Sequence, residues 1–229
     1  MATYRTATEV EQQHIKVMGE ELGTLYHALW NELAWLYSKW EEYVELFGTK
    51  PSRIELVNKV AGHFFRIVQD SLWESCLLHI ARLTDPLKSA GKENLTIKKL
   101  PSLITDEKIK KNLSELIEVA VEKADFCRDW RNRHIAHKDL GLAMKTGAEP
   151  LKPASRAAVK EVLSSISNVL NAVSGHHMDS TTMFEGSRGS ENAVSLLYVL
   201  DDGLRADEKR NERRKAGKYH AKDFQARDL

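Results

Sequence analysis

Apolar residues recur at alternating steps of three and four over most of this chain, which is the spacing of one face of an α-helix. The first such stripe runs to Phe47, and the glycine and proline that follow it are typical helix stops. It predicts one long helix over residues 8–47, bent at Gly19 and Gly23 because glycine tolerates backbone conformations that other residues avoid.

Four further stripes predict four more helices, separated by segments that hold the prolines and most of the glycines. Residues 86–101 are predicted to form a loop with one short helical turn, and residues 139–154 and 175–190 to form polar loops. We find no convincing strand pattern and no internal repeat. Long amphipathic helices need partners, so the pattern predicts an all-α protein, an antiparallel helical bundle of about five helices. The later helices are expected at 52–84, 105–127, 155–174 and 191–215.

Composition refines this picture without changing it. The 229 residues include 34 basic and 33 acidic side chains, so no strong global field attracts nucleic acid. Two cysteines exclude a disulfide scaffold, and no run of 18 apolar residues is present, so we expect a cytoplasmic protein with no membrane span. We expect a helical bundle over residues 1–205 and a charged C-terminal extension over 206–229.

One cluster of polar residues stands out, at the end of the third predicted helix. Three arginines and two histidines fall within ten residues, and the pattern of an arginine, an Asn or Asp, and a histidine occurs twice. One copy is Arg131-Asn132 with His137, and the other, three residues earlier, begins at Arg128 and ends at His134. A histidine can move a proton near neutral pH, and an arginine can stabilise the charge that grows on a phosphate. These residue types suit cleavage of a phosphodiester.

The geometry of a helix leaves two questions open for this cluster. Arg131 continues the apolar stripe, so it either lines a site or forms a structural ion pair, with Asp85, Asp129 or Asp139 as partner. Residues six apart on an unbroken helix are also turned by about 240° from each other. Arg131 and His137 can therefore act together only if the helix unwinds near His137 or if two copies of the chain meet.

The cluster resembles the signature of the HEPN family of helical domains, in which an arginine and a polar residue precede a histidine at the end of a long helix. The segments Arg82-Leu83-Thr84-Asp85 and His134-Ile135-Ala136-His137-Lys138-Asp139 are similar to the abortive-infection, AbiU-type branch of that family. The segment Leu196-Leu197-Tyr198-Val199-Leu200 is similar to it as well. The resemblance covers about residues 10–205.

This resemblance implies a metal-independent endoribonuclease that acts as a homodimer, with both motifs facing one cleft and a 2′,3′-cyclic phosphate as product. Arg131 would contact the scissile phosphate, His137 would be the acid/base group, and Asn132 would be the polar residue beside them. The implied role is that of an antiphage effector or toxin, with RNA as substrate and a nucleotidyltransferase-type antitoxin or other defence protein as partner. Many HEPN domains are instead non-catalytic modules that bind RNA or protein. Supporting roles fall to Arg128, His134, Asp139 and Trp130, the last by stacking on a base, and RNA contacts to Arg133 and Lys138.

Other chemistry has less support in the sequence. His134 and His137 have metal-ligand spacing, but no Cys or Glu completes the set and the neighbouring arginines repel a cation, so we expect neither a metal nor a cofactor. Cys76 and Cys127 fall on apolar stripes and are expected to be buried, unreactive thiols. The basic residues between 205 and 218 form either a solvated helical tail or an arm that contacts phosphate.

Overall fold

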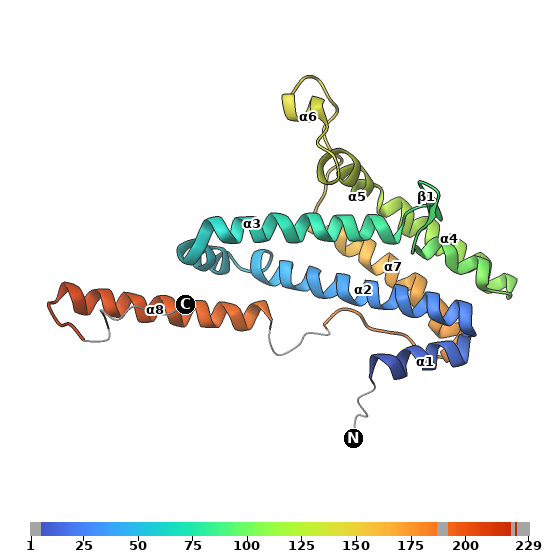
Figure 1. The fold of residues 1–229 in the computed structure, drawn as a ribbon, viewed down its shortest axis with the longest axis horizontal. Coiled ribbons are helices and arrows are strands. Elements are labelled where there is room, and N and C mark those ends of the chain that lie inside the picture. The colour runs from blue at the N-terminus through green and yellow to red at the C-terminus, as the bar shows by residue number, and fades with distance from the viewer. Residues whose placement is uncertain (1–5, 187–191, 221–222, 224–229) are drawn as a thin grey trace. The chain divides into compact units, whose positions relative to one another are not determined.

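The computed structural model of the protein describes residues 6–186, 192–220 and 223 (Figure 1). The fold is all-α, as predicted, with two strands of two residues each in the described part of the chain. Two compact units are present, Met1–Glu41 with Ser71–Ser187, and Glu42–Asp70 with Arg188–Leu229. The helices α2 and α3 contribute to both units.

The connections between elements are short except for residues 145–155 and 179–192. The helices are α1 (Ala7–Met18), α2 (Glu20–Phe47), α3 (Pro51–Leu83), α4 (Glu107–Lys123), α5 (Asp125–Trp130), α6 (Leu140–Met144), α7 (Arg156–Met178) and α8 (Ala193–Lys215). A 3₁₀-helix, η1, spans Ile97–Leu103, and a π-helical turn, η2, spans Arg131–Ile135. The strands β1 (Lys88–Ser89) and β2 (Lys92–Glu93) pair antiparallel.

The prediction of one helix over residues 8–47 was wrong, because the chain reverses at Gly19. This residue has a φ of 85°, which an L-residue rarely adopts, and it separates α1 from α2. The first helix then folds back along the second, and Nδ1 of His14 lies 3.2 Å from Nδ1 of His27. Gly23 allows this close packing, since a Cβ there would lie 2.5 Å from the Cα of Ile15.

The first unit is an antiparallel arrangement of α2, α3, α4 and α7. Contacts between side chains establish the directions: Arg82 near the end of α3 binds Glu32 in the middle of α2, while Trp73, earlier in α3, packs on Trp40, later in α2. The helices α4 and α7 pack together, and Lys123 at the end of α4 pairs with Glu161 near the start of α7. The core between these helices is closed by large side chains that are fully buried, Tyr26, Leu29, Leu33 and Leu36 from α2, Leu77 and Ile80 from α3, Leu113 from α4, and Leu163 and Ile166 from α7.

Several segments that we predicted to be loops contain regular structure. The segment 86–101 holds β1 and β2 besides the helical turn that we predicted, which is the start of η1, and 139–154 holds α6. The helix α7 begins after Ser155, close to its predicted start, but continues to Met178, and the Ser155 side chain caps it. The Asp106 side chain likewise caps α4.

The second unit contains the end of α2, the start of α3 and α8. Glu45 forms an ion pair with Arg53, and the Glu42 carboxylate accepts a hydrogen bond from the Ala193 N–H at the start of α8. This last helix runs without a break through residue 205, where the sequence suggests the bundle ends. Across the described residues, none of the helices combines the length and apolar character that crossing a membrane requires.

Candidate functional site

The helix that carries the cluster changes its winding at the cluster itself. After α5, the N–H of Ala136 bonds to the carbonyl of Arg131 at 2.9 Å, one residue further along than in an α-helix. Residues 136 and 137 then bend away and the helix ends. Such π-turns are rare and often occur at functional sites. The sequence left two ways for Arg131 and His137 to act together: the helix unwinds near His137, or two copies of the chain meet. Unwinding of the helix near His137 is observed within one chain.

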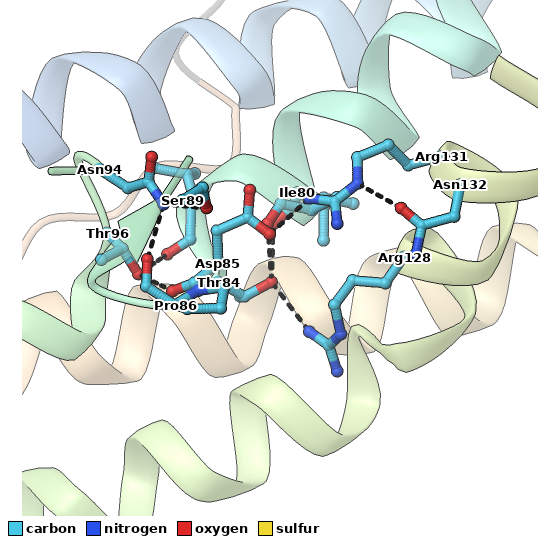
Figure 2. A network of polar contacts seen from close by, with 12 residues as sticks. Ile80, Thr84, Asp85, Pro86, Ser89, Asn94, Thr96, Arg128, Arg131 and Asn132 are labelled. Atoms are coloured by element: carbon cyan, nitrogen blue, oxygen red, sulfur yellow. Dashed lines mark hydrogen bonds and ion pairs between the residues drawn. The ribbon is translucent and has the colours of Figure 1, made fainter. Parts of the chain in front are cut away.

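Arg131 is held between two oxygen atoms from different parts of the chain. Its Nη1 forms a close ion pair with Asp85, one of the three carboxylates considered from the sequence, and its Nε donates to Oδ1 of Asn132 at 3.0 Å (Figure 2). The Arg131 side chain is 24% exposed and that of Asp85 is 14% exposed. An arginine carries five N–H donors, so these two bonds leave others available to a phosphate at the solvent-facing edge.

Arg128, one turn earlier, is bound more completely by the protein. Its guanidinium donates to the Val121 carbonyl at 2.7 Å, to the Thr84 hydroxyl at 3.3 Å and to Asp125 at 3.4 Å. Hydrogen bonding from Lys152, helped by the charge of Arg128, holds the pKa of Asp125 below its usual range. This arginine therefore fixes the junction between α4 and α5.

His134 is also part of a packed structure. Its Nε2 lies 3.4 Å from Oε1 of Glu74 on α3, and its ring meets the edge of Trp130 at a centroid distance of 5.3 Å. Trp130 donates its indole N–H to the carbonyl of Lys152 at 2.9 Å and packs against Trp73. The indole for which we expected a base-stacking role is thus partly buried and contacts Trp73 on α3, His134 of the motif and the Lys152 carbonyl.

Arg133, an expected RNA contact, uses its donors within the protein. It bonds to Asp139 at 3.2 Å, to Asp129 at 3.4 Å and to the Glu149 carbonyl at 2.6 Å. These bonds, first of all the one to Asp139, raise the pKa of Arg133. The pKa of Asp139 is lowered, mainly because its carboxylate accepts the N–H of Leu142 as the cap of α6. Arg133 and Asp139 together hold the segment that follows the motif.

His137 and Lys138 lie at the solvent-exposed end of the motif. Within the described residues, neither side chain has a hydrogen bond or an ion pair to another protein group, and His137 does not bond to Arg131 or Asn132. The structure thus brings Arg131 and Asn132 together and leaves His137 apart from them. It also distinguishes the two histidines of the pattern, because His134 contacts Glu74 and Trp130 while His137 is exposed. The two arginines, by contrast, are similarly exposed.

Three residues of this region are missing from the sequence-based set: Thr84, Thr96 and Glu74. The only sequence signal for them is that Thr84 lies in the Arg-Leu-Thr-Asp segment.

Among the described residues, no group of three or more His, Cys, Asp or Glu side chains is arranged to hold a metal ion. Both cysteines are fully buried, and burial raises the pKa of Cys76 to about 12.

Comparison with known proteins gives one match. The family model described as AbiU2, of HEPN type, matches residues 19–196, which include α2 to α7, the start of α8 and the whole Arg128–Asp139 cluster. Searches of curated proteins and of solved structures returned no match.

Proposed function

The chain belongs to the AbiU2 family of HEPN-type domains, and we propose that it is a metal-independent endoribonuclease that acts in abortive infection. The observation that carries the proposal is the contrast between the two histidines of the pattern. His134 pairs with Glu74 and packs on Trp130, whereas His137 is exposed and has no partner among the described residues. Arg128 and Arg131 are similarly exposed, at 21% and 24% of their side chains, but Arg128 bonds to three protein groups and Arg131 to two.

In this proposal the reaction is a transesterification within the RNA. His137 takes the proton from a ribose 2′-hydroxyl, the 2′-oxygen bonds to the adjacent phosphorus, and the bond to the 5′-oxygen breaks. The 5′-oxygen leaves as a hydroxyl after taking a proton from a protonated His137, so the products are a 2′,3′-cyclic phosphate and a 5′-hydroxyl end. Arg131 donates to the non-bridging oxygens, on which negative charge grows in the transition state. The step needs no metal, oxidant or co-reactant.

A second copy of the chain would complete the site. The Arg131 and His137 side chains do not bond to each other within one chain, so a homodimer in which two motifs face one cleft would allow Arg131 of one chain and His137 of the other to act on one phosphate. The proposed substrate is RNA, and a nucleotidyltransferase-type antitoxin or another defence protein is the proposed partner. Co-expression of such an antitoxin should relieve growth arrest caused by the wild-type chain.

A cleavage assay on total RNA and tRNA in the presence of EDTA tests the activity. Wild type should cleave, and His137→Ala should not, because the proton-transfer group is lost. His63→Ala is the matched control, since His63 is an exposed histidine on α3 outside the motif. Circular dichroism should show all three proteins folded. Cleavage that requires a divalent metal, or full activity of His137→Ala, would refute the proposal.

A non-catalytic binding module is the second candidate. The Asp85 carboxylate partly neutralises Arg131, and Arg133 is bound within the protein. Both features suit a surface that binds RNA or a protein without cleaving RNA. This candidate predicts RNA binding without turnover. The logarithm of affinity should then fall with the logarithm of salt concentration, with a slope of about −0.7 for each single-stranded phosphate contacted.

A further inference from the structure

Two consecutive residues at the end of α3 contact the two arginines of the cluster. The Thr84 hydroxyl accepts a hydrogen bond from Nη1 of Arg128 at 3.3 Å, and the Asp85 carboxylate pairs with Nη1 of Arg131 (Figure 2). Arg128 and Arg131 are three residues apart and therefore lie on the same side of their helix. The end of α3 thus matches the spacing of the arginines.

The backbone around Asp85 is fixed by hydrogen bonds that do not involve the cluster. The Thr96 hydroxyl, fully buried, lies 2.9 Å from the Asp85 carbonyl and 3.1 Å from the Leu83 carbonyl, so its single hydrogen is placed between the two carbonyls on either side of Thr84. Asn94 donates to the carbonyl of Pro86 at 2.8 Å. The loop that contains β1 and β2 is closed at its base by these bonds, so Asp85 has little freedom to move.

The Arg131 guanidinium is held on two of its edges as a result. Asp85 binds Nη1, and Asn132 accepts from Nε at 3.0 Å. A guanidinium is planar, so two bonds in its plane define where its remaining donors point. A group that is oriented before the substrate binds saves the cost of ordering it during the reaction, and small displacements of such groups reduce rates strongly.

We infer that Asp85 is a positioning residue for Arg131, and that Thr96 holds Asp85 in place for this task. The inference rests on the proposed ribonuclease activity and adds to it a carboxylate that never touches RNA. This role differs from that of a purely structural ion pair, which would affect only stability. It also differs from an inhibitory contact, in which Asp85 would lower activity by keeping Arg131 away from the phosphate.

Steady-state kinetics on an RNA oligonucleotide in EDTA distinguish these roles. Asp85→Asn keeps the size of the side chain but removes its charge, and kcat should fall about 10- to 100-fold while KM changes less than about threefold. Asp85→Glu should recover part of kcat, since the carboxylate is restored. Thr96→Val should lower kcat in the same way but less, because Asp85 and Arg131 both remain. Asp70→Asn is the control, as it breaks an exposed ion pair with Arg66 on α3.

A second measurement does not depend on catalysis. In the ¹⁵N spectrum of the whole chain, the Nε–Hε signal of Arg131, assigned by its loss in Arg131→Lys, should be displaced from the signals of solvated arginines and should exchange slowly. In Asp85→Asn it should move toward them and broaden, whereas Asp70→Asn should leave it unchanged.

The outcomes separate failure of the inference from failure of the proposed function. If the wild type does not cleave RNA, the activity is wrong, and the Arg131 signal alone decides whether Asp85 positions the guanidinium. An unchanged Arg131 signal in a folded Asp85→Asn variant would overturn the inference. An unchanged or increased kcat in that variant would overturn it as well, and an increase would indicate that Asp85 inhibits Arg131.

Discussion

The Arg131 guanidinium pairs with the carboxylate of Asp85, a residue 46 positions earlier in the chain. The two other carboxylates that the sequence offers as partners, Asp129 and Asp139, both bind Arg133 instead. The Asp85 pair therefore joins the π-turn to the end of α3, whereas Arg133 pairs with Asp129 one turn before it and with Asp139 at the start of α6. The Asp85 pair orients Arg131, which retains free donors, while Arg133 uses most of its donors within the protein.

Replacement of these arginines should separate stability from activity. Arg131→Ala should lower the free energy of unfolding by about 1–2 kcal/mol, between the values for exposed and buried ion pairs, because both partners are partly buried. Arg128→Ala should cost about 2–3 kcal/mol, since it also leaves the carbonyl of Val121 without its donor. Urea denaturation measures both. Only Arg131→Ala should be folded and inactive, and an unfolded Arg131→Ala would instead indicate a purely structural cluster.

The two histidines of the cluster should respond in opposite ways. His137→Ala should leave the free energy of unfolding within about 0.5 kcal/mol of wild type, because the exposed ring has no partner among the described residues. The same change should reduce the rate of cleavage by about 100-fold or more. His134→Ala should cost about 1 kcal/mol, because it loses the contacts with Trp130 and Glu74, and should retain cleavage within about tenfold. Thermal melts and the RNA assay in EDTA measure the two effects. The reverse pattern would identify Arg128 and His134 as the working pair.

The order of the helices is predictable from the sequence because the helices of the first unit bury apolar stripes. Ile80 on α3 and Leu113 on α4 are fully buried, whereas Val199 on α8 and Phe64 on α3, which also belong to apolar stripes, are exposed. The reversal at Gly19 is not predictable in this way. The stripe continues through it, since Met18 and Leu22 on either side are both buried, and only the tertiary packing of α1 on α2 separates a turn from a bend.

The candidate site is predictable to a smaller extent. The bond between Arg131 and Asn132 joins neighbours, and Asp85 is one of three carboxylates that the sequence suggests for Arg131. The roles of Thr84 and Thr96 are not predictable, although Thr84 lies in the Arg-Leu-Thr-Asp segment, because the Thr84 contact with Arg128 spans 44 residues and depends on how the loop with β1 and β2 closes. The π-turn has no compositional signature either, since it adds one residue to a turn that is otherwise helical.

Acid should destabilise the protein through a buried histidine on α3. Burial, reinforced by the charge of Lys39, lowers the pKa of His79 from 6.5 to about 4, although Glu32 opposes this and Arg82 adds to it. The unfolded chain therefore binds a proton between about pH 6.5 and pH 4 that the folded chain does not. The stability contributed by neutral His79 is present above pH 6.5 and is lost as the pH falls toward 4, by at most about 3 kcal/mol.

Urea denaturation across this pH range checks the effect. The free energy of unfolding should fall with decreasing pH in wild type, and His79→Gln should flatten the slope by up to one proton. A remaining slope is expected, since burial also lowers the pKa of His14 and of His177. An identical slope in wild type and His79→Gln would show that His79 is not the group responsible.

The close packing of α1 on α2 should make Gly23 the least replaceable glycine of the first unit. A Cβ at this position would lie 2.5 Å from the Cα of Ile15 and 2.7 Å from the carbonyl oxygen of His14, and both are backbone atoms that cannot rotate away. Gly23→Ala should therefore force the two helices apart and cost about 1–3 kcal/mol or more in unfolding free energy. Gly175→Ala, at a helical position with nothing within 4 Å of the new Cβ, should stabilise the protein by about 0.5–1 kcal/mol, because alanine favours the helix. Thermal melts of the two variants compare them directly, and equal effects would mean that α1 is not packed on α2 in solution.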